Sequence, residues 1–206
     1  MSCIKMHLDK NHLRRQLRQA RKSLTGYRRD RQQQRIRHFL TAIPQVRHAR
    51  RIAAYLPFDG EPDLLPFMRR VESKIWLPMI RSDWHLDFRP TCKLNALARR
   101  PINARRNRFG ILESQRLPIL RSAQMDVILM PLVGFDHHGN RLGMGAGFYD
   151  RSLVGLRRPR PALIGIAFDC QQTASVPVDP WDVPLDYIVT NRGIIKTNHN
   201  QARKPE

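Results

Sequence analysis

The sequence predicts an α/β fold with a mainly parallel sheet and a basic N-terminal helix. Short apolar segments, typical of buried strands, occur at residues 52–56, 75–78, 127–133, 163–168 and 187–190. Two segments of helical character, 61–71 and 148–156, lie between them. Strands that alternate with helices along a chain usually pair in parallel. A chain of 206 residues can bury one sizeable core, so we expect residues 1–195 to form a single domain.

The N-terminal part of the chain is strongly basic. The whole chain has a formal net charge of +20, and residues 1–50 hold 14 Lys and Arg residues against only Asp9 and Asp30. Apolar side chains in this part recur at three- and four-residue intervals, at Leu13, Leu17, Ala20 and Leu24. This spacing predicts an amphipathic helix with one face towards the core.

Lys10, Arg14 and Arg18 form a second line on this helix, four residues apart. Such a line can bind an anionic ligand, but it is also typical of a solvated helix face. RNA binds basic helices in a salt-dependent way, and Arg15, Arg18 and Arg21 are the candidates for that contact. No RNA-binding motif accompanies them, and aromatic residues, at 7% of the chain, do not alternate with the basic ones. RNA binding therefore remains an alternative.

The segment Phe58-Asp59-Gly60-Glu61 follows the first predicted strand. In parallel sheets, ligands bind at the carboxyl ends of the strands, and this segment belongs at that edge. Glu61 has two interpretations. A carboxylate that opens a helix stabilises the helix dipole, and a carboxylate in a cleft can accept hydrogen bonds from a polar heterocycle.

Residues 91–125 are polar and basic and show few periodic signals. We expect them to form loops around Phe109, Gly110 and Ile111. Residues 196–206 form a basic tail that we expect to be disordered.

A glycine-rich loop follows the third predicted strand. Gly143, Gly145 and Gly147 alternate with larger residues, which permits positive φ angles and lets backbone N–H groups approach an anion. The spacing excludes a Rossmann fingerprint, because Phe148 stands three positions after Gly145, and no Gly-Lys-Ser/Thr tripeptide of a Walker A loop follows. A tight packing turn between a helix and a strand is the other interpretation.

Charged residues flank this loop and favour a phosphate site. Arg141 and Arg151 can contact phosphate oxygens, and Asp150 offers the oxygen ligand that a nucleotide-bound magnesium ion prefers.

The loop and its surroundings resemble one enzyme family. Residues 141–151, RLGMGAGFYDR, are similar to the signature of the 5-formyltetrahydrofolate cyclo-ligase family, also called methenyltetrahydrofolate synthetase, and Pro-x-x-Gly-Phe-Asp precedes them at 131–136. Further resemblances occur in the same order as in the family, at residues 10–14, 55–63, 109–113 and 165–186. Together they cover most of the chain.

The resemblance implies a fold and a reaction. The family fold is a three-layer α/β/α sandwich. The family converts 5-formyltetrahydrofolate into 5,10-methenyltetrahydrofolate with ATP and Mg²⁺, releasing ADP and phosphate. The formyl oxygen is thought to attack the γ-phosphate, and N10 then captures the phosphorylated imine. Reduced folate and ATP would be the partners, and we expect a monomer. A degenerate relative that acts on another formylated or carboxylated metabolite is an alternative.

The resemblance also implies roles for individual residues. Asp150 and Asp182 would hold the metal, Leu56 and Glu61 would line the folate pocket, and Arg141 and Tyr149 are the candidate catalytic residues. The residues expected to bind ATP are Lys10, Arg14, Arg141, Leu142, Gly143, Met144, Gly145, Ala146, Gly147, Phe148 and Tyr149.

Three residues of the loop depart from the family pattern. Met144 and Phe148 stand where tyrosine is usual, and Ala146 stands where glycine or lysine is common. A methyl group at 146 narrows the loop, and the missing hydroxyls remove hydrogen bonds, but no phosphate-binding group is lost.

Cysteine usage indicates a reducing compartment. Cys3, Cys92 and Cys170 are far apart, odd in number and without metal-ligand spacing, which favours reduced thiols in the cytoplasm. No stretch approaches the roughly 20 apolar residues of a membrane span, so no membrane partner is expected. An organellar transit peptide is an alternative interpretation of the basic N-terminus.

Overall fold

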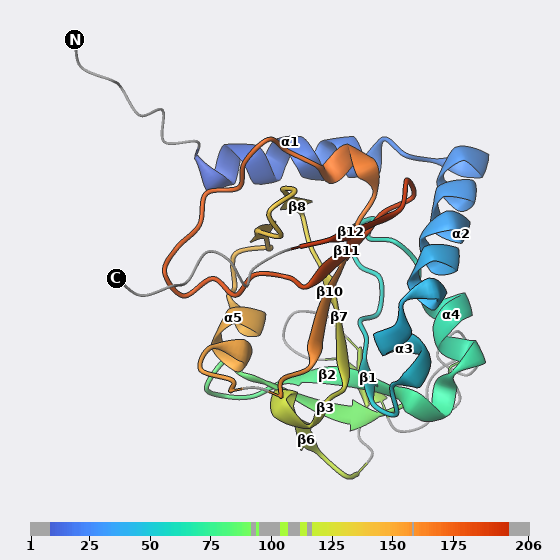
Figure 1. Cartoon of the computed structure of the whole chain (residues 1–206), viewed down its shortest axis with the longest axis vertical. Helices are drawn as coiled ribbons and strands as arrows, with labels where there is room; N and C mark the ends of the chain where they lie inside the picture. The colour runs from blue at the N-terminus through green and yellow to red at the C-terminus, as the bar shows by residue number, and fades with distance from the viewer. Residues whose placement is uncertain are drawn as a thin grey trace.

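An eight-stranded sheet lies at the centre of the computed structural model, in the order β12-β11-β10-β7-β1-β2-β3-β6 (Figure 1). The structure describes residues 9–91, 94, 104–106, 112–114, 117–157 and 159–197. The strands of this sheet are β1 (Ile52–Ala53), β2 (Ile75–Ile80), β3 (Leu86–Pro90), β6 (Leu120–Arg121), β7 (Val127–Pro131), β10 (Ala162–Ile166), β11 (Tyr187–Val189) and β12 (Ile194–Lys196).

The five predicted strands form the middle of the sheet and all run parallel to one another. The antiparallel strands β12, β3 and β6 complete its edges. The prediction of a mainly parallel sheet is therefore confirmed. These strands appear in the sequence as continuous apolar runs because a parallel strand in the middle of a sheet is buried on both faces.

Helices cover both faces of the sheet. They are α1 (Lys10–Lys22), α2 (Gly26–Ala42), α3 (Pro44–His48), α4 (Leu65–Arg70) and α5 (Phe148–Leu153). Successive strand residues alternate between two core clusters, so that Val127 belongs to one cluster and Ile128 to the other. The first cluster includes buried residues of α2, α3 and α4, and the second includes Leu153 of α5. Accordingly, α5 lies on the opposite side of the strands from α2, α3 and α4 (Figure 1).

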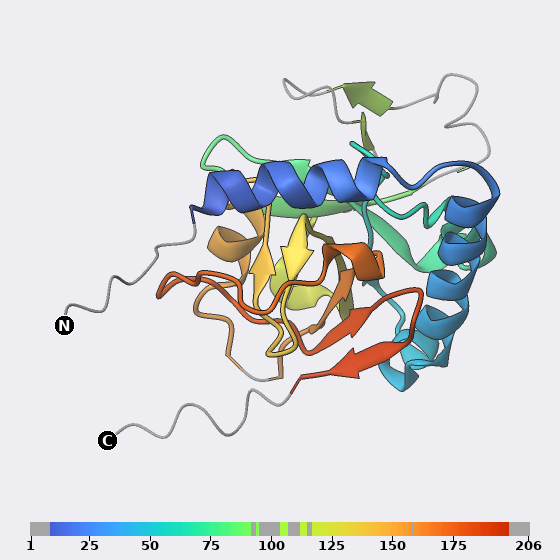
Figure 2. The ribbon, with the colours of Figure 1, turned by 90° about the horizontal axis from the view of Figure 1, so that it is seen from above.

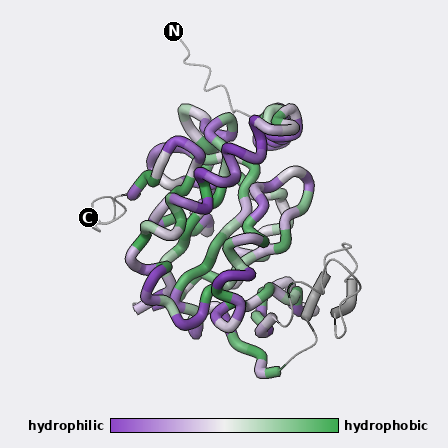
Figure 3. Tube along the Cα trace, turned by 90° about the vertical axis from the view of Figure 1, so that its right-hand side faces the viewer, coloured by the Kyte–Doolittle hydropathy of each residue, from purple (hydrophilic) through white to green (hydrophobic). Residues whose placement is uncertain are grey.

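The apolar residues gather along the central strands, whereas much of the outer chain is hydrophilic (Figure 3). Within the described part of the chain, no helix has both the length and the apolar character that a membrane span requires.

Two expected elements have different boundaries in the structure. The helix predicted at 61–71 is α4, which starts only at Leu65, because Pro62 and Asp63 precede it and the Asp63 carboxylate caps the backbone N–H of Leu65 at 2.8 Å. Glu61 thus lies before the helix and does not open it, so the helix-dipole interpretation of Glu61 is wrong. The helix predicted at 148–156 ends at Leu153, two residues before Gly155, which has a φ of 76°.

Several short elements were not predicted. Within 91–125 we expected loops, but β4 (Ala104–Arg106) and β5 (Leu112–Ser114) form an antiparallel pair, and β6 and the 3₁₀ turn η3 (Ser122–Gln124) follow. Strands of two or three polar residues have no detectable alternation, which is why they were missed. Phe109, Gly110 and Ile111 lie outside the described residues, as do Cys3 and Cys92.

The expected tail begins inside the sheet. β12 extends to Lys196, and the backbone N–H of Thr197 donates to the Asp186 carbonyl at 3.1 Å. Residues 198–206, which make up the rest of that tail, lie outside the described residues.

Helix α1 crosses one end of the molecule, over the small hairpin of β8 (Gly134–Phe135) and β9 (Arg141–Leu142) (Figure 2). Asp9 caps its first turn by accepting from the Asn11 N–H at 2.9 Å. Leu13 and Leu17 pack in a small core of their own with Val133, Leu142 and Val176. Leu17 lies directly over Gly134, and a Cβ added at Gly134 would lie 2.3 Å from Cδ1 of Leu17, so that the Leu17 side chain would have to shift.

We predict that Gly134→Ala destabilises the fold by disturbing the packing of Leu17 of α1. The added Cβ would overlap the Cδ1 atom of Leu17, and overpacking of this kind typically costs about 1–3 kcal/mol of unfolding free energy. Urea denaturation measures the loss. Gly143→Ala, where a Cβ meets open space, is the matched control. If α1 is the cause, Leu17→Ala should cost less in the Gly134→Ala background than alone, and strictly additive costs would contradict this explanation.

Candidate active site

A cleft of about 780 Å³ opens at the carboxyl ends of β1, β2 and β7. Its walls come from α1, from the segment after β1, from the loop between β9 and α5, and from residues 179–182. Every residue that the sequence analysis assigned to the site lines this cleft: Lys10, Arg14, Leu56, Glu61, Arg141, Leu142, Gly143, Met144, Gly145, Ala146, Gly147, Phe148, Tyr149, Asp150 and Asp182. Four segments that are distant in the sequence therefore meet at one place.

The glycine loop borders the cleft and two arginine side chains. Gly145 and Gly147 have φ angles of 105° and 69°, in the left-handed region that favours glycine. Arg14 donates from Nε to the Gly143 carbonyl at 2.9 Å, and Arg151 donates to the Ala146 carbonyl at 2.6 Å. The nearest atoms to a Cβ added at Gly145 or Gly147 belong to these arginines. The loop is thus not a tight packing turn between a helix and a strand.

Arg141 ties the loop to two other walls. Its guanidinium lies 2.5 Å from the Asp150 carboxylate and also donates to the Val183 carbonyl. The Val183 N–H donates in turn to Oδ1 of Asp150 at 3.2 Å. Because Val183 adjoins Asp182, the two aspartates proposed as metal ligands lie on neighbouring segments of one wall.

Lys10 reaches the same wall from α1. Its Nζ lies 2.6 Å from Oδ2 of Asp179 and 3.4 Å from Oδ2 of Asp182. Asp182 also accepts from the Asp179 N–H at 2.8 Å. These contacts hold the ammonium group of Lys10 at the mouth of the cleft.

Glu61 lines the cleft from the segment after β1 and is only 6% exposed. Its Oε2 accepts from the Phe58 N–H at 3.1 Å. Burial raises the pKa of Glu61 from 4.5 to about 7, although the Phe58 N–H and the charge of Arg21 oppose the rise and Asp59 adds to it. A carboxyl group with this pKa changes charge near neutral pH.

The phenol of Tyr149 interacts electrostatically with both Glu61 and Arg141. Burial and then the charge of Glu61 raise the pKa of its phenol, while Arg141 lowers it. The phenol therefore keeps its proton at neutral pH and can donate a hydrogen bond into the cleft.

The sequence analysis missed most of the apolar lining, such as Pro78, Ile80 and Leu86, and two residues with polar or stacking contacts. Asp179 provides the shortest contact to Lys10, and its place in the acidic segment Asp179-Pro180-Trp181-Asp182 could have indicated it. Trp84, in the turn between β2 and β3, stacks on Phe148 with ring centroids 5.6 Å apart and planes 14° apart. No sequence signal connects Trp84 with the loop. This stacking gives Phe148 a role that needs no tyrosine hydroxyl.

Helix α1 does not offer the basic face that RNA binding would require. Of the three arginines considered for that role, Arg21 is fully buried and Arg18 pairs with Asp59 at 2.7 Å. Only Arg15 is exposed. Arg21 is therefore not available for the RNA contact that was predicted from this helix.

The donor set is compatible with magnesium bound together with phosphate. In the part of the chain that the structure describes, no cluster of three or more His, Cys, Asp or Glu residues could hold a metal alone. Mg²⁺ is usually bound by one or two carboxylates plus substrate phosphates. Asp150 and Asp182 each use one oxygen in the contacts above, and the other oxygen of each accepts no hydrogen bond from the described residues.

Comparisons with known proteins point to one enzyme family. The sequence model of the 5-formyltetrahydrofolate cyclo-ligase family matches residues 6–191. The chain is 33% identical over 184 residues to the 5-formyltetrahydrofolate cyclo-ligase of Escherichia coli strain K12. This match covers 84% of this chain and 96% of the relative. The NMR structure of Aquifex aeolicus 5,10-methenyltetrahydrofolate synthetase is similar with a TM-score of 0.77 at 27% identity, over 96% of both chains. The Mycoplasma pneumoniae synthetase structure has a TM-score of 0.69 at 30% identity, over 89% of this chain and 99% of that one.

We predict that Glu61→Gln stabilises the fold at alkaline pH. Since the folded-state pKa is raised, the contribution of Glu61 to stability is full below pH 4.5 and is lost as the pH rises to about 7. The difference amounts to about 3 kcal/mol. Gln removes the charge and retains an oxygen for the Phe58 N–H, so the variant should be the more stable protein at pH 8 and lose that advantage at pH 5. Urea denaturation at both pH values measures this, with the less buried Glu72→Gln as control; an advantage independent of pH would refute the explanation.

Proposed function

The chain belongs to the 5-formyltetrahydrofolate cyclo-ligase family, and we propose that its cleft converts 5-formyltetrahydrofolate into 5,10-methenyltetrahydrofolate while ATP is cleaved to ADP and phosphate. The main support is that one cleft holds both a cationic glycine loop and a buried carboxyl group in an apolar wall. The first suits a triphosphate, and the second suits a polar heterocycle. The reaction needs both ligands side by side.

The nucleotide occupies the side of the cleft that the glycine loop forms. Lys10 and Arg14 come from α1, and Arg141 precedes the loop. Cations around a loop whose backbone turns through left-handed glycines can bind phosphate oxygens with charge-assisted hydrogen bonds. These residues neutralise the triphosphate and hold its γ-phosphate in place. Positioning of this kind supplies most of the catalysis in phosphoryl transfer.

Asp150 and Asp182 would hold the magnesium ion that accompanies the nucleotide. Their free carboxylate oxygens support this assignment, because hard oxygen ligands are those that Mg²⁺ prefers. When bound, the ion would neutralise part of the phosphate charge. Lys10 and Arg141 pair with these carboxylates, so the protein itself balances the two negative charges.

The reduced folate occupies the apolar side. This wall is built by residues at the carboxyl ends of β1, β2 and β7 and at the start of β3: Tyr55, Leu56, Pro78, Ile80, Leu86 and Pro131. Glu61, when ionised, accepts hydrogen bonds from N–H groups of the heterocycle. This pocket faces the nucleotide side, so the formyl oxygen can approach the γ-phosphate.

In the reaction, the formyl oxygen forms a bond to the γ-phosphorus and ADP leaves. N10 then adds to the activated carbon and loses its proton, and phosphate leaves as the ring closes. Arg141 balances negative charge on the transferred phosphoryl group. The protonated phenol of Tyr149 can donate a hydrogen bond to an oxygen of the reacting groups. The enclosing walls keep water away from the activated intermediate. We further infer that the enzyme works as a monomer in the cytoplasm.

Wild-type protein with ATP, Mg²⁺ and 5-formyltetrahydrofolate should form the methenyl chromophore, and Arg141→Ala should reduce kcat on the order of 100-fold. The physical reason is the loss of a positive charge beside the transferred phosphoryl group. Absorbance of the product measures turnover, and circular dichroism checks the fold, because Arg141 is only 5% exposed and bonds two neighbours. Arg141→Lys, which keeps the charge, should retain more activity. A folded wild type without turnover on this folate, but active on another formylated metabolite, would replace the proposal with a different substrate.

Lys10→Ala should raise the KM for ATP by roughly tenfold, because one charge-assisted hydrogen bond to phosphate is lost. The KM for the folate should change little. The matched control is Arg15→Ala, which removes the same charge from an exposed position of the same helix. Steady-state kinetics with each substrate varied in turn measures both constants. Equal effects of the two variants on ATP would mean that only the general positive field attracts the nucleotide.

A further inference from the structure

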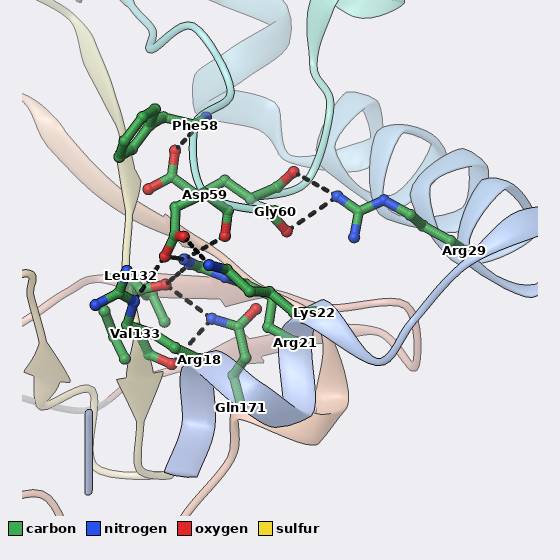
Figure 4. Close-up of polar contacts among 11 residues, drawn as sticks. Arg18, Arg21, Lys22, Arg29, Phe58, Asp59, Gly60, Leu132, Val133 and Gln171 are labelled. Carbon is green, nitrogen blue, oxygen red and sulfur yellow. Dashed lines mark hydrogen bonds and ion pairs between the residues drawn. The ribbon is translucent and has the colours of Figure 1, made fainter. Parts of the chain in front are cut away.

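The buried carboxylate of Asp59 is surrounded by three cations from one helix. Its oxygens lie 2.7 Å from Nε of Arg18, 2.9 Å from Nη2 of Arg21 and 2.5 Å from Nζ of Lys22 (Figure 4). The Asp59 side chain is 6% exposed and that of Arg21 is fully buried. We call these four residues the Asp59 cluster. It joins α1 to the segment between β1 and α4.

Stability alone does not explain this cluster. Burying ionic groups costs several kcal/mol of desolvation each, and apolar residues of similar size often serve stability as well or better. The cluster also holds more positive than negative charge, and Nε of Arg21 has no hydrogen-bond partner among the described residues. An arrangement that is expensive to bury and directional in its contacts suits positioning better than core packing.

The backbone of Asp59 forms the turn that places Glu61. Asp59 and Gly60 have φ angles of 50° and 81°, so two consecutive residues are left-handed. For a residue with a Cβ this conformation costs on the order of 1 kcal/mol. The turn closes through the Glu61 N–H, which donates to the Phe58 carbonyl at 3.0 Å, and the Phe58 N–H returns to the Glu61 carboxylate.

Arginines from two helices hold this turn. Arg21 donates to the Asp59 carbonyl at 2.8 Å. Arg29 of α2 donates to the Gly60 and Glu61 carbonyls at 2.9 and 3.0 Å (Figure 4). The orientation of the Glu61 carboxylate therefore depends on the positions of the helices.

The same helix that carries three members of the cluster also carries the nucleotide-facing cations. Lys10 and Arg14 lie in the first half of α1, and the cluster residues lie in the second half. At about 1.5 Å of rise per residue, only about 10 Å separates Arg14 from Arg21 along the axis. A displacement of either end moves the other, because the helix is continuous between them.

We propose that Asp59 is a positioning residue that couples the two substrate sites. It fixes α1, which carries Lys10 and Arg14, relative to the turn that carries Glu61, so that the helix and the turn move together. This rests on the proposed function of the cleft. A nucleotide that draws α1 onto the glycine loop thereby sets the turn in the orientation that binds the folate. By thermodynamic reciprocity, the folate favours the nucleotide to the same extent.

The coupling is measurable as the ratio of two dissociation constants. Titration calorimetry gives the affinity for a non-hydrolysable ATP analogue with Mg²⁺, without and with saturating 5-formyltetrahydrofolate. In the wild type we expect about fivefold tighter binding or more with folate present. Asp59→Asn should bring the ratio close to one, since it removes the charge that attracts all three cations while Asn still tolerates the left-handed backbone.

The pH dependence provides a second readout that a merely structural role would not change. The charged and titratable groups around Glu61 are Arg21 of α1, Arg29 of α2, Asp59 of its own turn, Tyr55 after β1 and Tyr149 of α5. Burial opposes ionisation of Asp59, but hydrogen bonds from Arg18 and Lys22 outweigh it and hold the pKa of Asp59 well below its usual range. Neutralising Asp59 removes a negative charge near Glu61 while the positive charge of Arg21 stays, so the pKa of Glu61 should fall. The acidic limb of kcat/KM for the folate should shift to lower pH.

Two further variants complete the experiment. Lys22→Met removes one cation whose side chain is 54% exposed, so it folds even if Asp59→Asn does not, and it should lower the coupling ratio part of the way. Asp169→Asn breaks a similar ion pair, to Arg192 at 2.7 Å, away from the cleft, and should leave the ratio unchanged.

The outcomes separate the two proposals. If the wild type binds neither ligand, the proposed function fails. If it binds both and the ratio in folded Asp59→Asn and Lys22→Met equals that of the wild type, only the coupling role of Asp59 is overturned. A ratio reduced equally by Asp169→Asn would also overturn it, because general loosening would then be the cause.

Discussion

The buried contact between Arg21 and Asp59 joins α1 to the turn after β1, and Arg21 also reaches the end of the strand that leads towards the glycine loop. Beyond Asp59, Arg21 donates to the Leu132 carbonyl at the end of β7 at 3.1 Å. Gln171 supports the same point by donating to the Leu132 and Val133 carbonyls at 2.7 and 3.0 Å (Figure 4). The chain from Leu132 leads directly into the hairpin and the glycine loop. One guanidinium thus connects the N-terminal helix, the turn after β1 and the segment after β7, which carry three of the four walls of the cleft.

This contact also explains part of the unusual charge of the chain. A helix rich in arginine looks like a surface for polyanions when only its sequence is considered. In the folded protein the basic side chains of α1 divide between tasks: Lys10 and Arg14 line the cleft, whereas Arg18 and Arg21 are used inside the protein. The few carboxylates near the cleft, such as Asp150 and Asp182, are already paired with cations. The cleft is lined by four cations, of which Arg14 and Arg151 form no ion pair with a carboxylate of the described residues, and by four carboxyl groups, so the positive field that attracts anions such as ATP and folate comes from the charge of the chain as a whole.

The sequence was informative where one local signal was sufficient. Five apolar runs became parallel strands because each was long enough to be buried on both sides, and the glycine loop could be found because its glycines and charges are contiguous. Helix α2 was missed, since its only buried residues, Gln33, Ile36 and Leu40, form too thin an apolar stripe to produce a helical pattern. The role of Asp59 was not accessible either. Its partners Arg18 and Arg21 are 41 and 38 positions away, and only the crossing of α1 over the sheet edge brings them together.

The position of Glu61 shows how stability and function oppose each other in this fold. An apolar or amide side chain would avoid a burial cost of about 3 kcal/mol at alkaline pH, which is a large fraction of the 5–15 kcal/mol that usually holds a domain together. The fold nevertheless holds the buried Glu61 with fixed partners, the Phe58 N–H and the turn that the arginines hold. A ligand that donates hydrogen bonds to this carboxylate satisfies a group that is already desolvated, so less of its binding energy is spent on removing water. The same ligand stabilises the folded state by mass action, and the cost of burying the charge is therefore offset when the cleft is filled.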